Sequence, residues 1–203
     1  MGANGTNVEL ARPRVRSREL GALGAALILY ILQDVAISAV GPDSPLAWLR
    51  AGVFFVATLA FIALALVLRR YLAAWIVAAG IAMNFLPMAA HGGLMPIAYE
   101  VIRDSGAFPE VTEEWIGRQV ENSKDIVLWR KDVRFYFFSD RFFLDVPGYR
   151  PNIYSLGDFV AFAGVAVAAL EAAAFVALGR PPLELALSRV RARTPRSRES
   201  SPA

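Results

Sequence analysis

Four predominantly apolar segments of about twenty residues constrain the fold of this chain more than any other feature. They cover residues 20–40, 47–68, 72–90 and 156–178. A helix rising 1.5 Å per residue needs roughly 20 residues to cross a hydrocarbon core of about 30 Å. Only 19% of the 203 residues are charged, and the mean hydropathy is +0.44. We therefore expect an all-α membrane protein with four transmembrane helices.

Arginine-rich segments predict the orientation of these helices. Residues 1–19 form a basic tail, Arg69 and Arg70 lie between the second and third apolar segments, and residues 179–203 form a second basic tail. Positively charged segments stay in the cytoplasm. Residues 91–155 carry eight Arg or Lys and ten Asp or Glu, and this loop is long enough to be translocated. We expect a multi-pass protein of the cytoplasmic membrane with both termini in the cytoplasm and this loop outside.

A cleaved signal peptide is the alternative interpretation of the first apolar segment, because basic residues precede it and residues 39–41 (Ala-Val-Gly) resemble a cleavage site. Three features argue against cleavage. The apolar stretch is longer than a usual signal core, it contains Gln33 and Asp34, and Pro42 would follow the cut directly. A membrane helix is the better interpretation.

The long loop should have structure of its own, because connections of this length are seldom unstructured. Thr112 followed by Glu113 and Glu114 predicts a helix from Thr112 to Asn122, capped by the threonine hydroxyl. Aromatic and cationic residues alternate over residues 129–144. Such a composition is typical of a segment at the membrane surface or over the helix ends, and it also suits a partner surface.

Polar residues near the outer ends of the apolar segments are candidate functional groups, since an unpartnered charge in a membrane costs about 3 kcal/mol. Asp34, Asn84, His91 and Asp158 fall at similar depth if each helix rises 1.5 Å per residue. They predict an outward-facing polar pocket in which Asp34 and His91 hold a ligand or exchange protons. The alternative is a set of interhelical hydrogen bonds, each worth about 0.6 kcal/mol.

Two acidic residues of the fourth segment have structural interpretations of their own. Ser155 and Asp158 have the spacing of a capping box, in which each side chain bonds the backbone of the other residue. Glu171 lies near the cytoplasmic end, where we expect it to pair with Arg69 or Arg70.

Small residues at four-residue intervals in the same segment predict a close helix contact. They are Gly164, Ala168 and Ala172. Small side chains let helix backbones approach one another. Packing within the molecule is our preferred interpretation, and a dimer interface is the alternative.

Several kinds of chemistry have no support in the composition. The chain has no cysteine, so thiolate metal sites, cysteine nucleophiles and disulfides are excluded, and its one histidine excludes a multi-histidine metal site. We found no nucleophile, cofactor or metal motif. We expect no catalytic residue, cofactor or metal, and the lipid bilayer and other membrane subunits as partners rather than nucleic acid.

Three short motifs occur in one order along the chain. Residues 84–96 begin with Asn84 and end in His-Gly-Gly-Leu-Met-Pro, residues 140–142 read Asp-Arg-Phe, and residues 154–158 read Tyr-Ser-Leu-Gly-Asp. In this arrangement the chain resembles the uncharacterised bacterial family of small membrane proteins known as domain of unknown function 5317. The resemblance covers about residues 20–178. It implies a four-helix bundle in the bacterial inner membrane and no established activity.

Within the first motif, glycines and a proline predict a tight turn back over the helix ends. The turn residues are Gly92, Gly93, Met95 and Pro96. Glycine allows backbone angles closed to other residues, and proline stiffens the exit. His91 stands where the family usually has Asn, so a titrating role at this position would not carry across the family.

These observations favour a non-enzymatic accessory or assembly subunit of a membrane complex. The alternative is a protein that handles a small ligand or protons in the outward-facing polar pocket. A membrane enzyme acting on a lipid-linked substrate is a third and weaker hypothesis.

Overall fold

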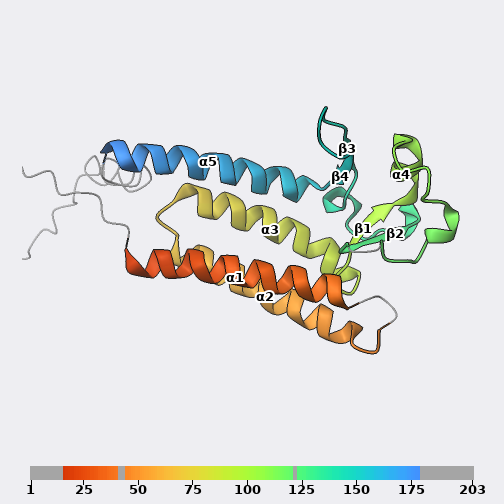
Figure 1. Ribbon diagram of the computed structural model, residues 1–203, viewed down its shortest axis with the longest axis horizontal. Coiled ribbons are helices and arrows are strands. Elements are labelled where there is room, and N and C mark those ends of the chain that lie inside the picture. The colour runs from red at the N-terminus through yellow and green to blue at the C-terminus, as the bar shows by residue number, and fades with distance from the viewer. Residues whose placement is uncertain (1–15, 41–43, 121–122, 179–203) are drawn as a thin grey trace, which may run out of the picture.

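Four long helices run side by side in the computed structural model, which describes residues 16–40, 44–120 and 123–178 (Figure 1). They are α1 (Ser17–Ala39), α2 (Ala47–Val67), α3 (Leu72–Ala90) and α5 (Leu156–Leu178). Each covers one of the four predicted apolar segments, and the boundaries agree to within three residues. Continuous hydrophobicity therefore identified the long helices correctly.

Three helices in the described part are long and apolar enough to cross a membrane. They are Trp48–Val67, Leu72–Ala90 and Leu156–Ala177. Only 17% to 22% of each apolar window is buried inside the protein. Most of the apolar surface of these helices therefore faces outward, as lipid contact requires.

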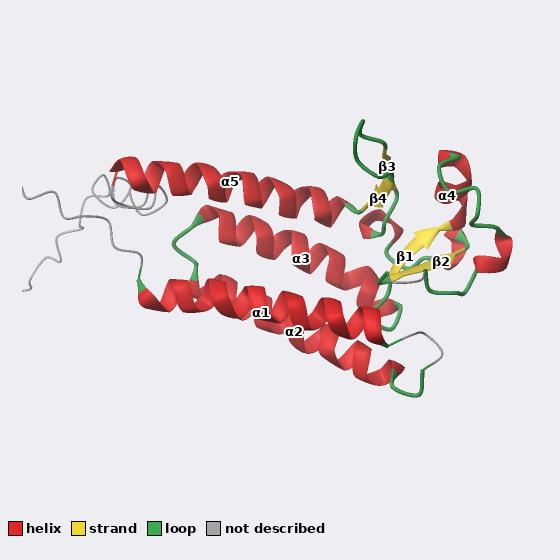
Figure 2. Cartoon of the chain, in the orientation of Figure 1, coloured by secondary structure: helices red, strands yellow, loops and turns green. Residues whose placement is uncertain are grey.

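The helices are arranged as a layer. The main contacts join α1 to α2, α2 to α3 and α3 to α5. In Figure 2, α3 lies between α5 on one side and the α1–α2 pair on the other. Among the described residues, no main contact joins α1 to α5. The start of α1 and the end of α5 lie at the same end of this layer (Figure 1). We call this end, which carries Arg16, Arg18, Arg69 and Arg70, the arginine end, and the opposite end the loop end.

The loop between α3 and α5 folds into a cap over the loop end (Figure 1). The cap contains the helix α4 (Tyr99–Ser105) and the strands β1 (Met95–Ala98), β2 (Asp125–Leu128), β3 (Phe142–Leu144) and β4 (Asn152–Tyr154). β1 pairs in parallel with β2, and β3 pairs antiparallel with β4. The expectation of an all-α fold is therefore wrong for the cap, although the protein as a whole is mostly helical.

The predicted cap helix from Thr112 to Asn122 is also wrong for the residues that the structure describes there. A single 3-10 turn occupies Glu113–Trp115, and Thr112 makes no side-chain cap. Gly117 then adopts φ +85°, and its N–H donates to the carbonyl of Val127 at 2.8 Å. A left-handed glycine ends the turn, and pairing with β2 replaces helical hydrogen bonds. Asn122 lies outside the described residues.

Two apolar clusters hold the cap together and attach it to the helices. The cap's own cluster consists of Ile97, Tyr99, Ile102, Val127 and Ile153. A second cluster joins Phe54 of α2 and Met88 of α3 to Met95 of β1, which is 0% exposed. Because Met95 starts the first strand of the cap, its burial between two long helices fixes the cap on the helix layer.

Candidate functional site at the loop end of the helices

A polar network joins α3 to the start of α5. Asn84 Nδ2 donates to Asp158 Oδ1 at 2.8 Å, and Ser155 Oγ donates to Asn84 Oδ1 at 2.7 Å. Both sides of the Asn84 amide are thus bonded across the helix pair, one as donor and one as acceptor. This orientation lets Asn84 hold the beginning of α5 against α3.

Ser155 and Asp158 also bond each other's backbone at the start of α5. The Asp158 N–H donates to Ser155 Oγ at 3.0 Å, and the Ser155 N–H donates to Asp158 Oδ2 at 2.9 Å. This is the reciprocal arrangement of a capping box. The Asp158 carboxylate therefore has one oxygen on Asn84 and the other on its own helix start.

Glycines beside this network bring the two helices unusually close. A Cβ atom added to Gly157 would lie 2.0 Å from Asn84 Oδ1, and one added to Gly80 would lie 2.6 Å from the carbonyl oxygen of Gly157. Gly164 approaches Val77 equally closely. The contact face of α5 therefore passes through Gly157 and Gly164. Ala168 and Ala172, which were predicted to share the face of Gly164, are exposed.

His91 connects α3 to another part of the cap. Its Nδ1 lies 2.7 Å from the carbonyl oxygen of Pro87, and the N–H of Arg134 donates to its Nε2 at 3.3 Å. The tautomer with hydrogen on Nδ1 suits these two contacts, because Nδ1 then donates and Nε2 accepts. Nε2 also lies 3.4 Å from the carbonyl oxygen of Asp132. His91 thus ties the last turn of α3 to the segment that carries Arg134.

Of the four residues of the predicted polar pocket, the structure brings two together. Asn84 and Asp158 are directly bonded, whereas the contacts of His91 go to backbone groups of Pro87, Asp132 and Arg134. Asp34 belongs to α1, but its side chain lies outside the described part of the chain. The described geometry is that of contacts between structural elements.

The turn residues of the first motif make the junction between α3 and the cap. Gly92 and Gly93 have φ values of +66° and +89°, which favour glycine. A Cβ atom on Gly93 would lie 3.3 Å from Cα of Ala51, so α2 leaves little space there. Met95 and Pro96 are fully buried at the start of β1. The motif thus carries the chain from α3 across α2 into the cap.

Glu171 has a different role from the predicted pairing with Arg69 or Arg70. Its two carboxylate oxygens accept the backbone N–H groups of Leu72 and Ala73, at 2.9 and 3.0 Å. These are among the first amides of α3, which have no partner inside their own helix. A carboxylate there also complements the positive end of the helix dipole. Glu171 of α5 therefore caps α3, and it is buried.

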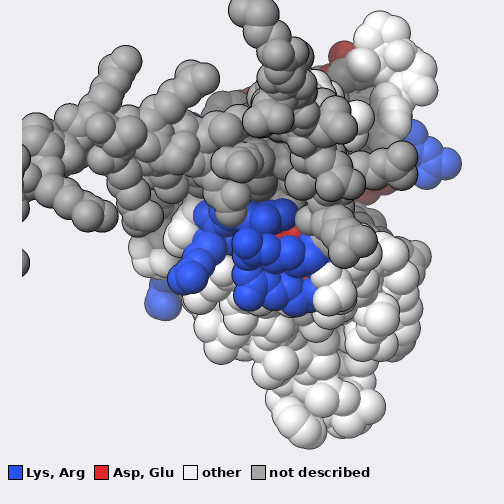
Figure 3. Space-filling model, turned by 90° about the vertical axis from the view of Figure 1, so that its left-hand side faces the viewer, with Lys and Arg blue, Asp and Glu red and all other residues white. Residues whose placement is uncertain are grey.

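A buried pair at the arginine end was not anticipated from the sequence. Glu19 of α1 is 1% exposed, and its Oε1 lies 2.8 Å from Nε of Arg70. Its Oε2 accepts the N–H of Arg16 and a second bond from Arg70. Figure 3 shows this end, where blue basic side chains gather around a small area of red acidic atoms. The sequence contains no signal for this pair, because Glu19 follows an arginine-rich segment. A charged residue in such a segment is expected to be exposed and needs no buried partner.

Three charged residues of the cap were also not anticipated from the sequence. Burial, together with the charge of Asp125, raises the pKa of Asp140 to about 8. Burial likewise raises the pKa of Asp125. Desolvation works to lower the pKa of Lys124, but the carboxylates of Asp140 and Asp125 outweigh it and the pKa is raised. The charges of Lys124, Asp125 and Asp140 therefore influence one another, and Asp158 adds to the same field.

Arg50 joins three parts of the chain. The sequence contains a signal that could have identified it as a candidate residue. Its guanidinium donates to the carbonyl of Val40 at the end of α1 and to Gln119 Oε1 in the cap, and it is 5% exposed. It is the one charged residue within the apolar segment 47–68. An ionisable group within an apolar segment is by that position alone a candidate for a functional or structural polar contact.

No group of three or more His, Cys, Asp or Glu side chains is placed to hold a metal ion within the described ranges. The residues of the site are donors and acceptors of structural hydrogen bonds, with a buried charged cluster beside them.

The order of the three motifs and the helix layer that they join point to one family. A model for a family of unknown function, DUF5317, matches residues 18–170. The chain belongs to this family. The match covers three of the long helices entirely or nearly so, the whole cap and most of α5. Searches of curated proteins and of solved structures gave no significant match.

Proposed function

We propose that this DUF5317 protein is a non-enzymatic accessory or assembly subunit of a membrane complex, and that its cap meets the partner. The proposal includes four transmembrane helices, with α1 as the fourth, and both termini in the cytoplasm of a bacterial cell. Support for this topology comes from the arginines at the end where α1 starts and α5 ends, since positive segments stay inside.

The observation that carries the proposal is a strained, exposed phenylalanine on the cap. Phe135 has φ +57°, and its side chain is 52% exposed. A bulky residue in the left-handed region costs of order 1–3 kcal/mol and is typical of functional positions. Phe137 is 55% exposed beside it, and the guanidinium of Arg141 lies 4.7 Å from its ring. We call Phe135, Phe137 and Arg141 the aromatic patch.

A protein partner suits this patch because aromatic residues and arginine are enriched at the centres of interfaces. The 3-10 turn Tyr136–Phe138 contacts α3 and α5, so the patch is held rigidly at the loop end. Rigid anchors lose little conformational entropy on binding. The network of Asn84 and Asp158 supports the same proposal. These polar groups are already bonded to each other, so they favour a structural role over ligand binding.

The test separates partner binding from folding. Asn tolerates the left-handed region, so Phe135→Asn should keep or raise the thermal unfolding midpoint while weakening association. Phe135→Asn and Phe137→Ser together should abolish stoichiometric co-purification in mild detergent. Tyr149→Ser, which changes another exposed aromatic residue of the cap, is the matched control. A wild-type protein that elutes as a clean monomer from its native membrane would contradict the proposal.

The alternative function is proton or small-ligand handling at the loop end, and the buried Asp140 favours it. A carboxyl group with a raised pKa next to Lys124 and Asp125 can exchange a proton near neutral pH. Proton flux into proteoliposomes should then fall with Asp140→Asn and with Asp34→Asn, and stay unchanged with the exposed Asp145→Asn. If all three variants gave the proton flux of the wild type, Asp140 and Asp34 would have only a structural role.

A further inference from the structure

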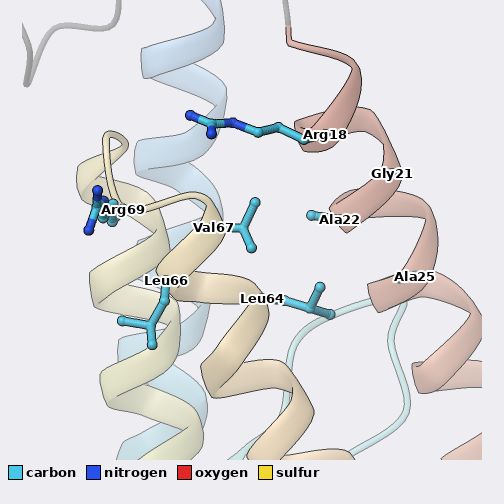
Figure 4. A pocket seen from close by; sticks show the side chains of 8 residues that line it. All are labelled: Arg18, Gly21, Ala22, Ala25, Leu64, Leu66, Val67 and Arg69. Atoms are coloured by element: carbon cyan, nitrogen blue, oxygen red, sulfur yellow. The ribbon is translucent and has the colours of Figure 1, made fainter.

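A groove runs between α1 and α2 from the arginine end toward the middle of the helices. It consists of two adjoining hollows of about 460 and 360 Å³. The hollows share Ala25, Leu64 and Val67, so they form one continuous depression. Small residues on the α1 side, Gly21 and Ala22 among them, make room for it (Figure 4).

The groove is apolar along its length and cationic at its mouth. Leu29, Ala60 and Ala63 line its deeper part, where none of the described lining residues is charged. Arg18 and Arg69 line the mouth. In Figure 4 the Arg18 side chain extends from α1 across the mouth toward the side where Arg69 lies.

The two arginines at the mouth differ from their neighbour Arg70. Arg70 is bonded to the buried Glu19. The guanidinium groups of Arg18 and Arg69 make no hydrogen bond or ion pair within residues 16–40, 44–120 and 123–178, and both residues are exposed. Among the described residues that line the two hollows, none is acidic. Within the described part of the chain, the mouth therefore presents two positive charges that no acidic side chain pairs with.

The depth of the groove matches one leaflet of a bilayer. From Arg18 to Leu29 a helix rises about 16 Å at 1.5 Å per residue. Half of a hydrocarbon core of about 30 Å is roughly 15 Å. A molecule with an anionic head at the arginines and a hydrocarbon tail ending at Leu29 would fill the groove over that depth.

We propose that this groove binds one anionic phospholipid from the leaflet at the arginine end. The phosphate lies between Arg18 and Arg69, and one acyl chain follows Ala25 and Leu64 toward Leu29. The inference rests on the part of the proposed function that places α1 and α2 in the membrane, and it is independent of the aromatic patch.

Charge favours a lipid over the protein segments that could reach the groove. Residues 179–203 contain six Arg and two Glu, so this tail would bring further positive charge to a cationic mouth. A second copy would bring the same two arginines. An anionic phospholipid supplies the opposite charge at the head and hydrocarbon for the apolar part.

Native mass spectrometry of the full chain, released from nanodiscs that contain equal amounts of phosphatidylglycerol and phosphatidylcholine, measures the preference. The wild type should retain one phosphatidylglycerol. Arg18→Gln with Arg69→Gln should lower the preference about fivefold per arginine, the effect of about 1 kcal/mol each. Arg118→Gln with Arg150→Gln, two exposed arginines of the cap, should leave it unchanged. Equal preference in both double variants would overturn the proposal.

Filling the groove tests the tail of the lipid separately from its head. Ala25→Phe places a ring where the two hollows meet and should abolish the retained lipid of either kind. Ala166→Phe, on an exposed position of α5, is the matched control. Retention of phosphatidylglycerol by Ala25→Phe at the wild-type level would contradict a site in this groove.

Photo-crosslinking in native membranes identifies the occupant directly. With p-benzoylphenylalanine at position 64, irradiation should give an adduct with a phospholipid. A crosslink to residues 179–203 or to a second copy would overturn the proposal. Because nanodisc incorporation itself requires membrane insertion, loss of lipid preference in an inserted protein refutes this inference alone, whereas failure to insert refutes the proposed topology.

Discussion

Asn84 and Asp158 lie 2.8 Å apart, Nδ2 to Oδ1, across the contact between α3 and α5, the most extensive one among the described helices. A double-mutant cycle of Asn84→Ala and Asp158→Ala should give a coupling energy of about 0.5 to 1.5 kcal/mol. Asp158→Ala should be the more damaging single change, since it also removes the bond to the Ser155 N–H. Thermal unfolding in detergent, followed by tryptophan fluorescence, provides the measurement. Additive losses would mean that the pair contributes nothing as a pair.

Gly80 should not tolerate a side chain. A Cβ atom there would lie 2.6 Å from the Gly157 carbonyl oxygen and 2.7 Å from the Ala161 nitrogen. Gly80→Ala should lower stability by about 1 to 3 kcal/mol, despite the better helix propensity of alanine. Gly24→Ala is the control, since nothing lies within 4 Å of its added Cβ. That variant should gain up to about 1 kcal/mol. Two equally stabilised variants would contradict the close contact.

Glu171→Gln should destabilise the start of α3. The amide keeps only one acceptor oxygen for the N–H groups of Leu72 and Ala73, and it lacks the negative charge that suits a helix start. We expect a loss of about 1 to 2 kcal/mol and faster amide exchange at these two residues. Glu110→Gln, at an exposed position of the cap, should be neutral. Unchanged amide exchange at Leu72 would argue against the capping of α3 by Glu171.

Replacement of His91 should distinguish a tether from a titrating group. His91→Ala removes the bonds to Pro87 and Arg134 and should cost about 1 kcal/mol, with faster exchange of the Arg134 amide. Asn can donate and accept at nearly the same positions, so His91→Asn should restore slow exchange. A variant that behaves like alanine would show that the ring itself is needed.

Asp140 should make stability fall as the pH rises. Its pKa is about 8 in the folded protein, against 3.8 ordinarily, so folding takes up a proton between about pH 4 and pH 8. The contribution of the neutral Asp140 carboxyl group to the free energy of unfolding is fully present at low pH. It decreases as the pH rises through this window. Asp140→Asn removes the titration, so its advantage over the wild type should grow from pH 5 to pH 8 and then level off, reaching about 1 to 3 kcal/mol.

Thermal unfolding midpoints at pH 5, 6.5, 8 and 9 measure this difference. Asp145→Asn, at an exposed position, should follow the wild type throughout. If the difference between Asp140→Asn and the wild type stayed constant across this range, Asp140 would not carry the titration.

Hydrophobicity predicted the long helices because lipid exposure requires continuous apolar sequence, and a helix is then the simplest way to satisfy the backbone. The cap was harder to predict. β1 and β2 have four residues each and pair across a gap in sequence from Ala98 to Asp125. Strands this short have little periodicity, and their partners are set by tertiary contacts.

The hydrogen-bond partners of the polar residues were likewise predictable only where they are close in sequence. The spacing of Ser155 and Asp158 is local, and the structure has the reciprocal bonds that this spacing predicted. Glu171 bonds to backbone amides of another helix, and any residue presents those amides. No pattern of side chains could therefore indicate its partner. Asp140 belongs to a cluster that exists only once the cap has folded.

The capping of α3 by a residue of α5 sets an order of events during synthesis. Ribosomes add about 5 to 20 residues per second, so the 99 residues that separate Glu171 from Leu72 take roughly 5 to 20 seconds. Until Glu171 follows, the first amides of α3 need another hydrogen-bond partner, and its glycine face has no helix to pack against. The newly made α3 therefore lacks its contact partner until α5 is complete, and any factor that shields this face in the meantime would aid biogenesis.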